Sequence, residues 1–96
     1  MTFKVRVKFF TTLREITEKK EEQIEFSKAA TVESLLKYLS RKYGDEFIDY
    51  VYDELGSVRG YLHLLVNGQS TTALRGLRTR LKEGDQVAIL PPVGGG

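Results

Sequence analysis

The feature that most constrains the fold is a stretch of helical periodicity that stands between segments of strand periodicity. Apolar residues recur in this stretch at the spacing of one helical face, at Val32, Leu35, Leu36, Leu39 and Tyr43. Thr31 precedes the stretch as a candidate N-cap, and Gly44 follows it where a C-terminal cap is expected. The sequence therefore predicts a helix over residues 32–43 that covers one face of a sheet.

Strand periodicity lies on both sides of this helix. Residues 3–9 alternate apolar and basic side chains, and Ile24 and Phe26 resume the alternation further on. Residues 61–66 form an almost continuous apolar run that ends at Asn67-Gly68, a pair typical of a tight hairpin turn. These patterns predict two antiparallel strands before the helix and a central strand after it.

The remaining segments complete the order of elements. Residues 69–74 are predicted to return as a short polar edge strand, and residues 86–90 to form a last strand that Pro91 stops. Residues 11–22 are expected to be a polar loop, and residues 47–55 a short second helix. Leu77 and Leu81 are expected to close one end of the sheet from an irregular loop.

This order predicts an α+β protein of the β-grasp, or ubiquitin-like, type. A mixed sheet of about five strands would wrap around one main helix, with a short second helix beside it. The last strand is expected inside the sheet, because a small fold cannot leave Val87 and Ile89 exposed. We expect residues 1–90 to form this domain and residues 91–96 to form a tail.

Composition limits the function classes. The 96 residues, 41% of them apolar, suffice for one domain with a modest core. The absence of cysteine excludes disulfides, thiolate metal sites and a cysteine nucleophile. A net charge of +2 with interleaved signs gives no support for nucleic-acid binding, and the basic residues between 75 and 82 are interpreted as a solvated loop. No stretch has the length of a membrane span, so we expect no membrane partner and a cytoplasmic location.

The chain closes with Pro91-Pro92-Val93-Gly94-Gly95-Gly96. Two prolines end any sheet ladder and favour a stiff extended segment, and glycines have no side chain to bury. The predicted result is an exposed arm that presents a carboxylate and that fits into a narrow slot of a partner enzyme. A frayed terminus or an engineered addition would look the same.

Four motifs together resemble the ubiquitin-like sulfur carriers, above all the small subunit of molybdopterin synthase. They are FFTTLRE at residues 9–15, TVESL at 31–35, VNG at 66–68 and GLRTRLKEGDQVAILPPVGGG at 76–96. The resemblance covers nearly the whole chain, and the last motif is the most specific. Two departures are the long segment from Gly44 to Gly60 and Gly94, where the family more often has alanine or serine.

The resemblance implies a carrier or cosubstrate with no catalytic residues of its own. An ATP-dependent E1-like activating enzyme would adenylate the carboxylate of Gly96, and sulfur would then replace the adenylate to give a thiocarboxylate. That group would donate sulfur in molybdopterin (molybdenum cofactor) biosynthesis, with the catalytic large subunit of the synthase as a second partner. No cofactor is expected on the chain itself, because ATP is used by the activating partner.

Strand parity predicts the surface that these partners bind. If Val5, Leu64 and Ile89 face the helix, the opposite sheet face presents Leu65 and Leu90. We predict that these two residues anchor a partner beside the tail, with a basic rim from the first strand. The same predicted interface includes His63, Phe10, Pro92 and Val93, with His63 interpreted as a packing or surface residue and not as a catalyst.

Two other functions stay open at this level. A ubiquitin-like protein modifier would use the same tail and adenylate but would join Gly96 to lysines of target proteins. A β-grasp interaction domain with an idle tail would need neither. The acceptor of the sulfur, which in different pathways is a pterin, a thiazole or a transfer RNA, cannot be read from the chain.

Overall fold

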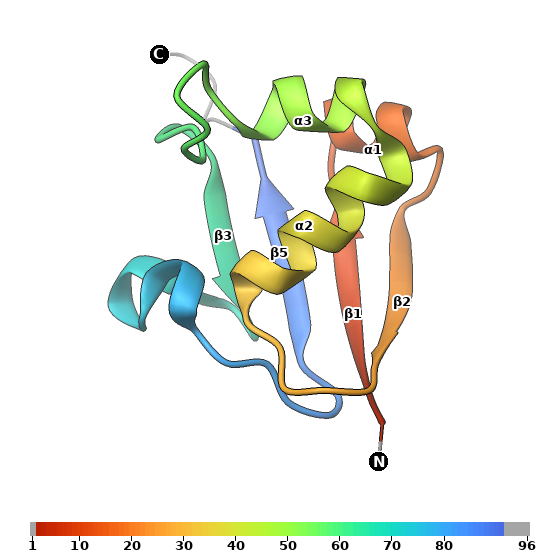
Figure 1. Cartoon of the computed structure of the whole chain (residues 1–96), viewed down its shortest axis with the longest axis vertical. Helices are drawn as coiled ribbons and strands as arrows, with labels where there is room; N and C mark the ends of the chain where they lie inside the picture. The colour runs from red at the N-terminus through yellow and green to blue at the C-terminus, as the bar shows by residue number, and fades with distance from the viewer. Residues whose placement is uncertain (1, 92–96) are drawn as a thin grey trace.

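The structure, a computed structural model, describes residues 2–91 and contains a five-stranded sheet with helices packed on one side (Figure 1). In chain order the elements are β1 (Phe3–Phe9), α1 (Thr12–Thr17), β2 (Glu21–Phe26), α2 (Val32–Tyr43), α3 (Asp45–Val51), β3 (His63–Val66), β4 (Gln69–Ser70), the 3₁₀ turns η1 (Thr71–Ala73) and η2 (Gly76–Arg78), and β5 (Gln86–Leu90). The predicted β-grasp architecture is confirmed.

The sheet is mixed, with the strand order β2-β1-β5-β3-β4. β5 runs parallel to β1 and antiparallel to β3, and the other two neighbouring pairs are antiparallel. The last strand of the chain therefore occupies the middle of the sheet, as its apolar pattern predicted. Parallel neighbours need a long crossover, and residues 10–85 supply it, with α2 crossing the sheet diagonally (Figure 1).

Helix α2 has the predicted bounds, and local chemistry fixes its start. The Thr31 side chain accepts a hydrogen bond from the Ser34 N–H at 3.2 Å, and the Ser34 hydroxyl accepts one from the Thr31 N–H at 3.2 Å. This reciprocal capping box satisfies two donors that the first turn would leave free. At the other end Gly44 has φ +78°, a backbone conformation that favours glycine.

The core lies between α2 and the inner face of the sheet. Val32, Leu35, Leu36 and Leu39 of α2 are fully buried there, against Leu62, which directly precedes β3, and alternate residues of the central strands: Val5, Val7, Phe9, Leu64, Val66, Val87 and Ile89. Each such side chain contributes about 1.5–3 kcal/mol through burial. Leu81 also joins the core, and Leu77 packs against it from η2, as expected for the segment that closes one end of the sheet.

The predicted polar loop over residues 11–22 is wrong, because this segment forms α1 and the first residues of β2. Leu13 is buried and Ile16 packs against the core, so one turn of helix covers the edge of the hydrophobic cluster. The Thr17 hydroxyl donates to the Leu13 carbonyl oxygen at 2.9 Å. The charged residues that follow obscured this short apolar face in the sequence.

The predicted bounds of three elements also change. α3 starts at Asp45 and ends at Val51, because Asp53 accepts backbone hydrogen bonds from Leu55 and Ser57 and turns the chain away. Leu55, which the predicted helix included, is 90% exposed. β4 ends at Ser70, whose hydroxyl caps the 3₁₀ turn η1, and β3 begins two residues later than residue 61. Within residues 2–91, no helix is long and apolar enough to cross a membrane.

Candidate partner-binding site

The sheet face opposite α2 carries the predicted interface residues. His63 and Leu65 of β3 lie opposite Leu90 and Ala88 of β5 in the antiparallel register. Opposed residues project their side chains to the same face of a sheet, so these four side chains form one block. His63 is exposed and the other three are half-buried, whereas Leu64 and Ile89 point into the core. The structure thus confirms the predicted division of the two faces.

Phe10 lies at the same end of this face. Phe9 is paired with Ile89 in the parallel register of β1 and β5, which places the next residue, Phe10, beside Leu90. Phe10 is half-buried, and the Arg14 guanidinium lies over its ring, 5.9 Å from the centroid. The ends of β1 and β5 and the start of β3 therefore meet at one corner, which we call the exit corner: Phe10, His63, Leu65, Ala88 and Leu90.

The chain leaves the sheet at this corner. Pro91 follows the last residue of β5 directly. The predicted tail residues Pro92, Val93, Gly94, Gly95 and Gly96 lie outside the residues that the structure describes. Their predicted roles therefore stay predictions.

The basic rim predicted along β1 is partly neutralised by its neighbour β2. Lys4 lies opposite Glu25, and Lys8 lies opposite Glu21. Arg6 reaches Glu21 diagonally, with 3.1 Å between Nε and Oε2, and both side chains are about half exposed. Exposed pairs of this kind contribute little to stability. On the open face, positive charge therefore lies on β1, next to the exit corner, and negative charge lies on β2, on the far side of β1 from that corner.

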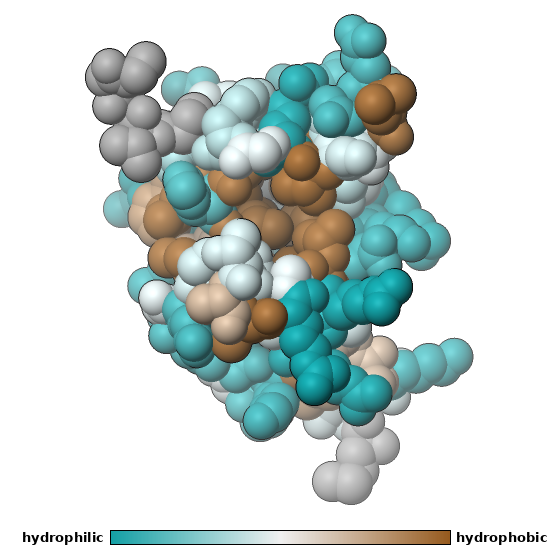
Figure 2. All heavy atoms as spheres, turned by 90° about the vertical axis from the view of Figure 1, so that its left-hand side faces the viewer, coloured by the Kyte–Doolittle hydropathy of each residue, from teal (hydrophilic) through white to brown (hydrophobic). Residues whose placement is uncertain are grey.

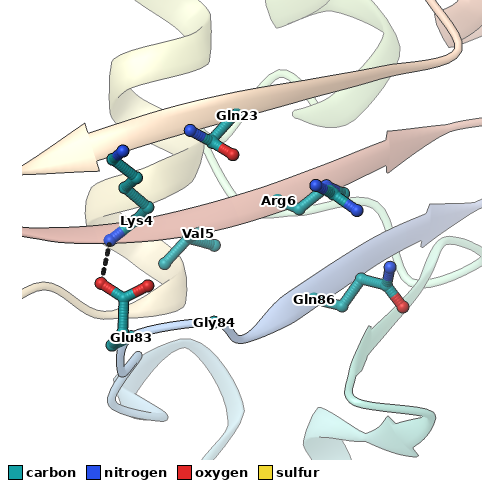
Figure 3. Close-up of a pocket in the computed structure, with 7 residues that line it drawn as sticks. All are labelled: Lys4, Val5, Arg6, Gln23, Glu83, Gly84 and Gln86. Carbon is teal, nitrogen blue, oxygen red and sulfur yellow. Dashed lines mark hydrogen bonds between the residues drawn. The ribbon is translucent and has the colours of Figure 1, made fainter.

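A polar hollow occupies the opposite end of the same face (Figure 3). It is lined by Lys4, Val5, Arg6, Gln23, Glu83, Gly84 and Gln86. Part of its lining is already engaged, because Glu83 accepts a hydrogen bond from the Lys4 N–H at 3.1 Å and the Gly84 N–H donates to the Lys4 carbonyl at 2.8 Å. Gln86 and Leu90 are the two ends of β5, so this hollow is remote from the exit corner.

The sequence reading missed a buried carboxylate that joins β2 to the end of α2. Glu22 is 8% exposed and accepts hydrogen bonds from Lys42 Nζ and the Tyr43 hydroxyl, with Lys19 Nζ at 3.6 Å. Burial opposes its ionisation, but these hydrogen bonds and the two positive charges outweigh burial and hold the pKa of Glu22 below its ordinary value. Burial and the hydrogen bond to Glu22 raise the pKa of Tyr43.

The alternation of side-chain direction along the second strand could have located this carboxylate from the sequence. Glu22 has the same parity as Ile24 and Phe26, so it points to the helix side of the strand. Its network joins two elements of the fold and lies on the side away from the open face. We assign it a structural role. Within residues 2–91, no three histidine or carboxylate side chains gather as a metal site would require.

The strand order, the diagonal helix and the exposed exit corner define the β-grasp class of ubiquitin-like proteins. The chain belongs to the ThiS family, whose model matches residues 7–96. It is 33% identical over 92 residues to small archaeal modifier protein 3 of Haloferax volcanii, a match that covers 96% of this chain and 98% of the relative. It is 32% identical over 66 residues to a putative sulfur carrier protein of Archaeoglobus fulgidus, a match that covers 69% of this chain and 74% of the relative.

Solved structures of similar proteins share this fold. The solution structure of small archaeal modifier protein 1 from Methanosarcina acetivorans has 34% identity and a TM-score of 0.81, and the match covers 100% of this chain and 99% of that one. A putative molybdopterin converting factor, subunit 1, from Pyrococcus furiosus has 30% identity and a TM-score of 0.75, with 95% and 99% covered. CysO in the BexX/CysO complex of Amycolatopsis orientalis has 28% identity and a TM-score of 0.75, with 96% and 99% covered.

The relatives are small modifiers and sulfur carriers, not catalytic enzymes. One of them has been solved in complex with another protein. The chain is accordingly a member of a ubiquitin-like family of small modifiers and sulfur carriers.

Proposed function

We propose that this chain is a sulfur-carrier protein that is activated at Gly96. The observation that carries the proposal is the ending Pro-Pro-Val-Gly-Gly-Gly, attached directly to the central strand β5 at an exposed apolar corner. The family match through residue 96 and the sulfur-carrier relative support the same reading. A rigid sheet would thus hold the start of the arm while a partner enzyme receives its end.

The chemistry has to be supplied by partners. A carboxylate is a poor electrophile at neutral pH, so an ATP-dependent E1-like enzyme would join the Gly96 carboxylate to the α-phosphate of ATP and release pyrophosphate. A sulfur nucleophile would then displace AMP and leave a thiocarboxylate. This group is a nucleophile at neutral pH and would displace an oxygen leaving group from a bound acceptor. Hydrolysis of the new acyl–sulfur bond would then leave the sulfur on the acceptor and restore the Gly96 carboxylate. ATP is used by the activating enzyme, and this chain needs no cofactor of its own.

We propose molybdopterin biosynthesis as the pathway, with a pterin as the sulfur acceptor and the catalytic large subunit of the synthase as the protein partner. The support is the likeness to the Pyrococcus furiosus protein named as a molybdopterin converting factor subunit. Binding of the thiocarboxylated chain to the purified large subunit tests this pathway. If no complex formed, the acceptor would instead be a thiazole or a transfer RNA.

The exit corner is the proposed anchor for the activating enzyme. Leu65 and Leu90 are half-buried, project to the open face and lie on neighbouring strands. Apolar side chains at the centre of an interface commonly carry most of the binding free energy. His63 and Phe10 would extend the contact, and Pro92 and Val93 would lead the arm into the partner's active site.

The first prediction is that the double variant L65D/L90D loses adenylation at least tenfold and keeps its fold. Two buried carboxylates would each be desolvated without a partner in the complex. ATP–pyrophosphate exchange with the activating enzyme measures the effect, and circular dichroism checks the fold. The matched control is I48D/L55D, which adds the same charge at exposed positions outside the corner. A fully active L65D/L90D would rule out the proposed anchor.

The Haloferax volcanii relative favours a second candidate, a protein modifier that is conjugated through Gly96 to lysines of target proteins. Both functions use the same adenylate. Intact-mass analysis after incubation with ATP and cell extract separates them, since a carrier exchanges one oxygen for sulfur and a modifier leaves glycine remnants on other proteins. Deleting Gly95 and Gly96 should abolish either product, and unchanged binding and activity would instead support an interaction domain with an idle tail.

A further inference from the structure

The edge of the sheet at β3 is only half covered. β3 pairs with β5 along its whole length, but β4 pairs only with Leu65 and Val66 before the chain turns into η1. Within residues 2–91, the backbone ladder on this side of β3 therefore stops at Leu65. Proteins usually protect such an edge with charge, proline or a covering segment.

The turn geometry shows which backbone groups point outward. Asn67 and Gly68 have φ +53° and +83°, the combination of a two-residue hairpin loop in which Val66 and Gln69 form the hydrogen-bonded pair. Hydrogen-bonding direction alternates along a strand, so the N–H and C=O of Leu64 point the same way as those of Val66. They lie beyond the last paired residue and are directed at the position that another strand would occupy.

A groove of about 420 Å³ lies alongside this open stretch. Its apolar lining comes from Val58, Leu62, Leu64 and Leu77, and Thr71 and Thr72 border it on the η1 side. Figure 2, which faces this edge of the molecule, shows apolar residues gathered around a hollow between more hydrophilic regions. An added strand would thus find both backbone partners and a pocket for an apolar side chain.

The charge around the groove indicates which kind of peptide segment would bind there. Residues 59–82 contain no aspartate or glutamate, and their basic residues are Arg59, Arg75, Arg78, Arg80 and Lys82. Arg75 and Arg78 flank the groove residues Gly76 and Leu77, and both are exposed. Within the described part of the chain, none of these five side chains forms a salt bridge. The uncompensated positive charge complements an acidic partner.

We propose that this edge, defined by Leu62–Leu64 and the groove beside it, binds an extended peptide segment of a partner protein by strand addition. The segment would carry apolar residues for the groove and acidic residues on its flanks. The apolar side chains that line the groove favour a peptide over a nucleic acid. The other edge of the sheet, β2, presents Glu21, Gln23 and Glu25 and would repel such a segment. The groove meets the exit corner only at His63, which lines it, and binding there does not require activation of Gly96.

The second prediction concerns a probe peptide of four valine and isoleucine residues with two aspartates on each side. Titrated into the full-length chain, it should shift the amide resonances of Leu62–Leu64 and of η1 and η2. Amide exchange at Leu64 should slow at least tenfold, because its N–H gains a partner. A version with lysine flanks should bind at least tenfold more weakly, and added salt should weaken the acidic version.

Charge-reversal variants test the basic rim. R75E/R78E should weaken the acidic peptide about tenfold, whereas K20E/K28E, the same charge change at exposed positions outside residues 59–82, should bind normally. The proposal fails if the shifts fall on Phe10, Ala88 and Leu90 of the open face, if both peptides bind equally, or if a ten-nucleotide single-stranded RNA binds the edge more tightly. Self-association of the free protein through β3 would also overturn it.

Discussion

At the residue scale, Glu22 shows how a single side chain links two elements. It projects from β2 toward the helix layer, where Lys42 and Tyr43 donate to its two carboxylate oxygens. A carboxylate that is this deeply buried is tolerated because it is hydrogen-bonded and paired with positive charge. The hydrogen bond to Glu22 raises the pKa of Lys42.

The third prediction is that E22Q lowers the free energy of unfolding by about 1–3 kcal/mol at pH 7, since the network loses its ionic partner. The folded-state pKa of Glu22 lies below its ordinary value of 4.5. Its ionic contribution is therefore fully present above pH 4.5 and is lost as the pH falls through the folded-state pKa. Urea unfolding at pH 7 and pH 3 should show the difference between wild type and E22Q shrinking at acid pH. An equal difference at both pH values would contradict the ionic role.

At the element scale, α2 begins where its cap dictates. Thr31 has extended backbone dihedrals and its side chain satisfies a first-turn donor, while Glu33 places negative charge near the positive end of the helix dipole. The cap is tied to the rest of the fold, because the Val32 N–H donates to the Thr79 carbonyl at 3.0 Å. The start of the helix thus depends on local sequence and is reinforced by a distant loop.

The fourth prediction is that T31A destabilises the protein by about 1 kcal/mol, the ordinary value of a lost N-cap. T31N should retain most of the stability, because its side-chain oxygen can accept the same hydrogen bond. Thermal unfolding followed by circular dichroism measures both variants. If T31A and T31N lost equal stability, the hydrogen bond from the Ser34 N–H would not be the cause.

At the scale of the whole molecule, β5 joins the two halves of the fold. It pairs with β1 on one side and β3 on the other, so the last strand of the chain closes the sheet around the core. Its alternation assigns one face to α2 and the other to the open face that carries the exit corner. Neighbouring residues of one strand therefore have different roles, stability for Ile89 and partner contact for Leu90.

The fifth prediction separates these roles. I89A should lower the free energy of unfolding by about 2–5 kcal/mol, because Ile89 is fully buried and its loss leaves a cavity. L90A should cost at most about 1 kcal/mol, since Leu90 is only half-buried, but it should weaken activation by the E1-like enzyme. Chemical denaturation and ATP–pyrophosphate exchange measure the two effects. A severe loss of stability in L90A would place this residue in the core and remove it from the proposed interface.

Local patterns alone determined the bounds of α2, the hairpin turn at Asn67-Gly68 and the inward and outward faces of three strands. They also placed Leu65 and Leu90 on the same face, because side-chain direction in a strand follows from parity. Periodicity missed α1, whose apolar face is a single helical turn, and it extended α3 to Leu55, where the hydrogen bonds of Asp53 turn the chain instead.

The tertiary structure decided which residues that are far apart in the sequence lie next to one another. It placed β5 between β1 and β3, brought Phe10 and His63 to Leu90, turned Glu22 toward Lys42, and left the edge of β3 open beside a basic groove. Strand order, cross-strand register and edge exposure depend on contacts between residues far apart in the chain, and local periodicity carries no information about which strand becomes the neighbour of which.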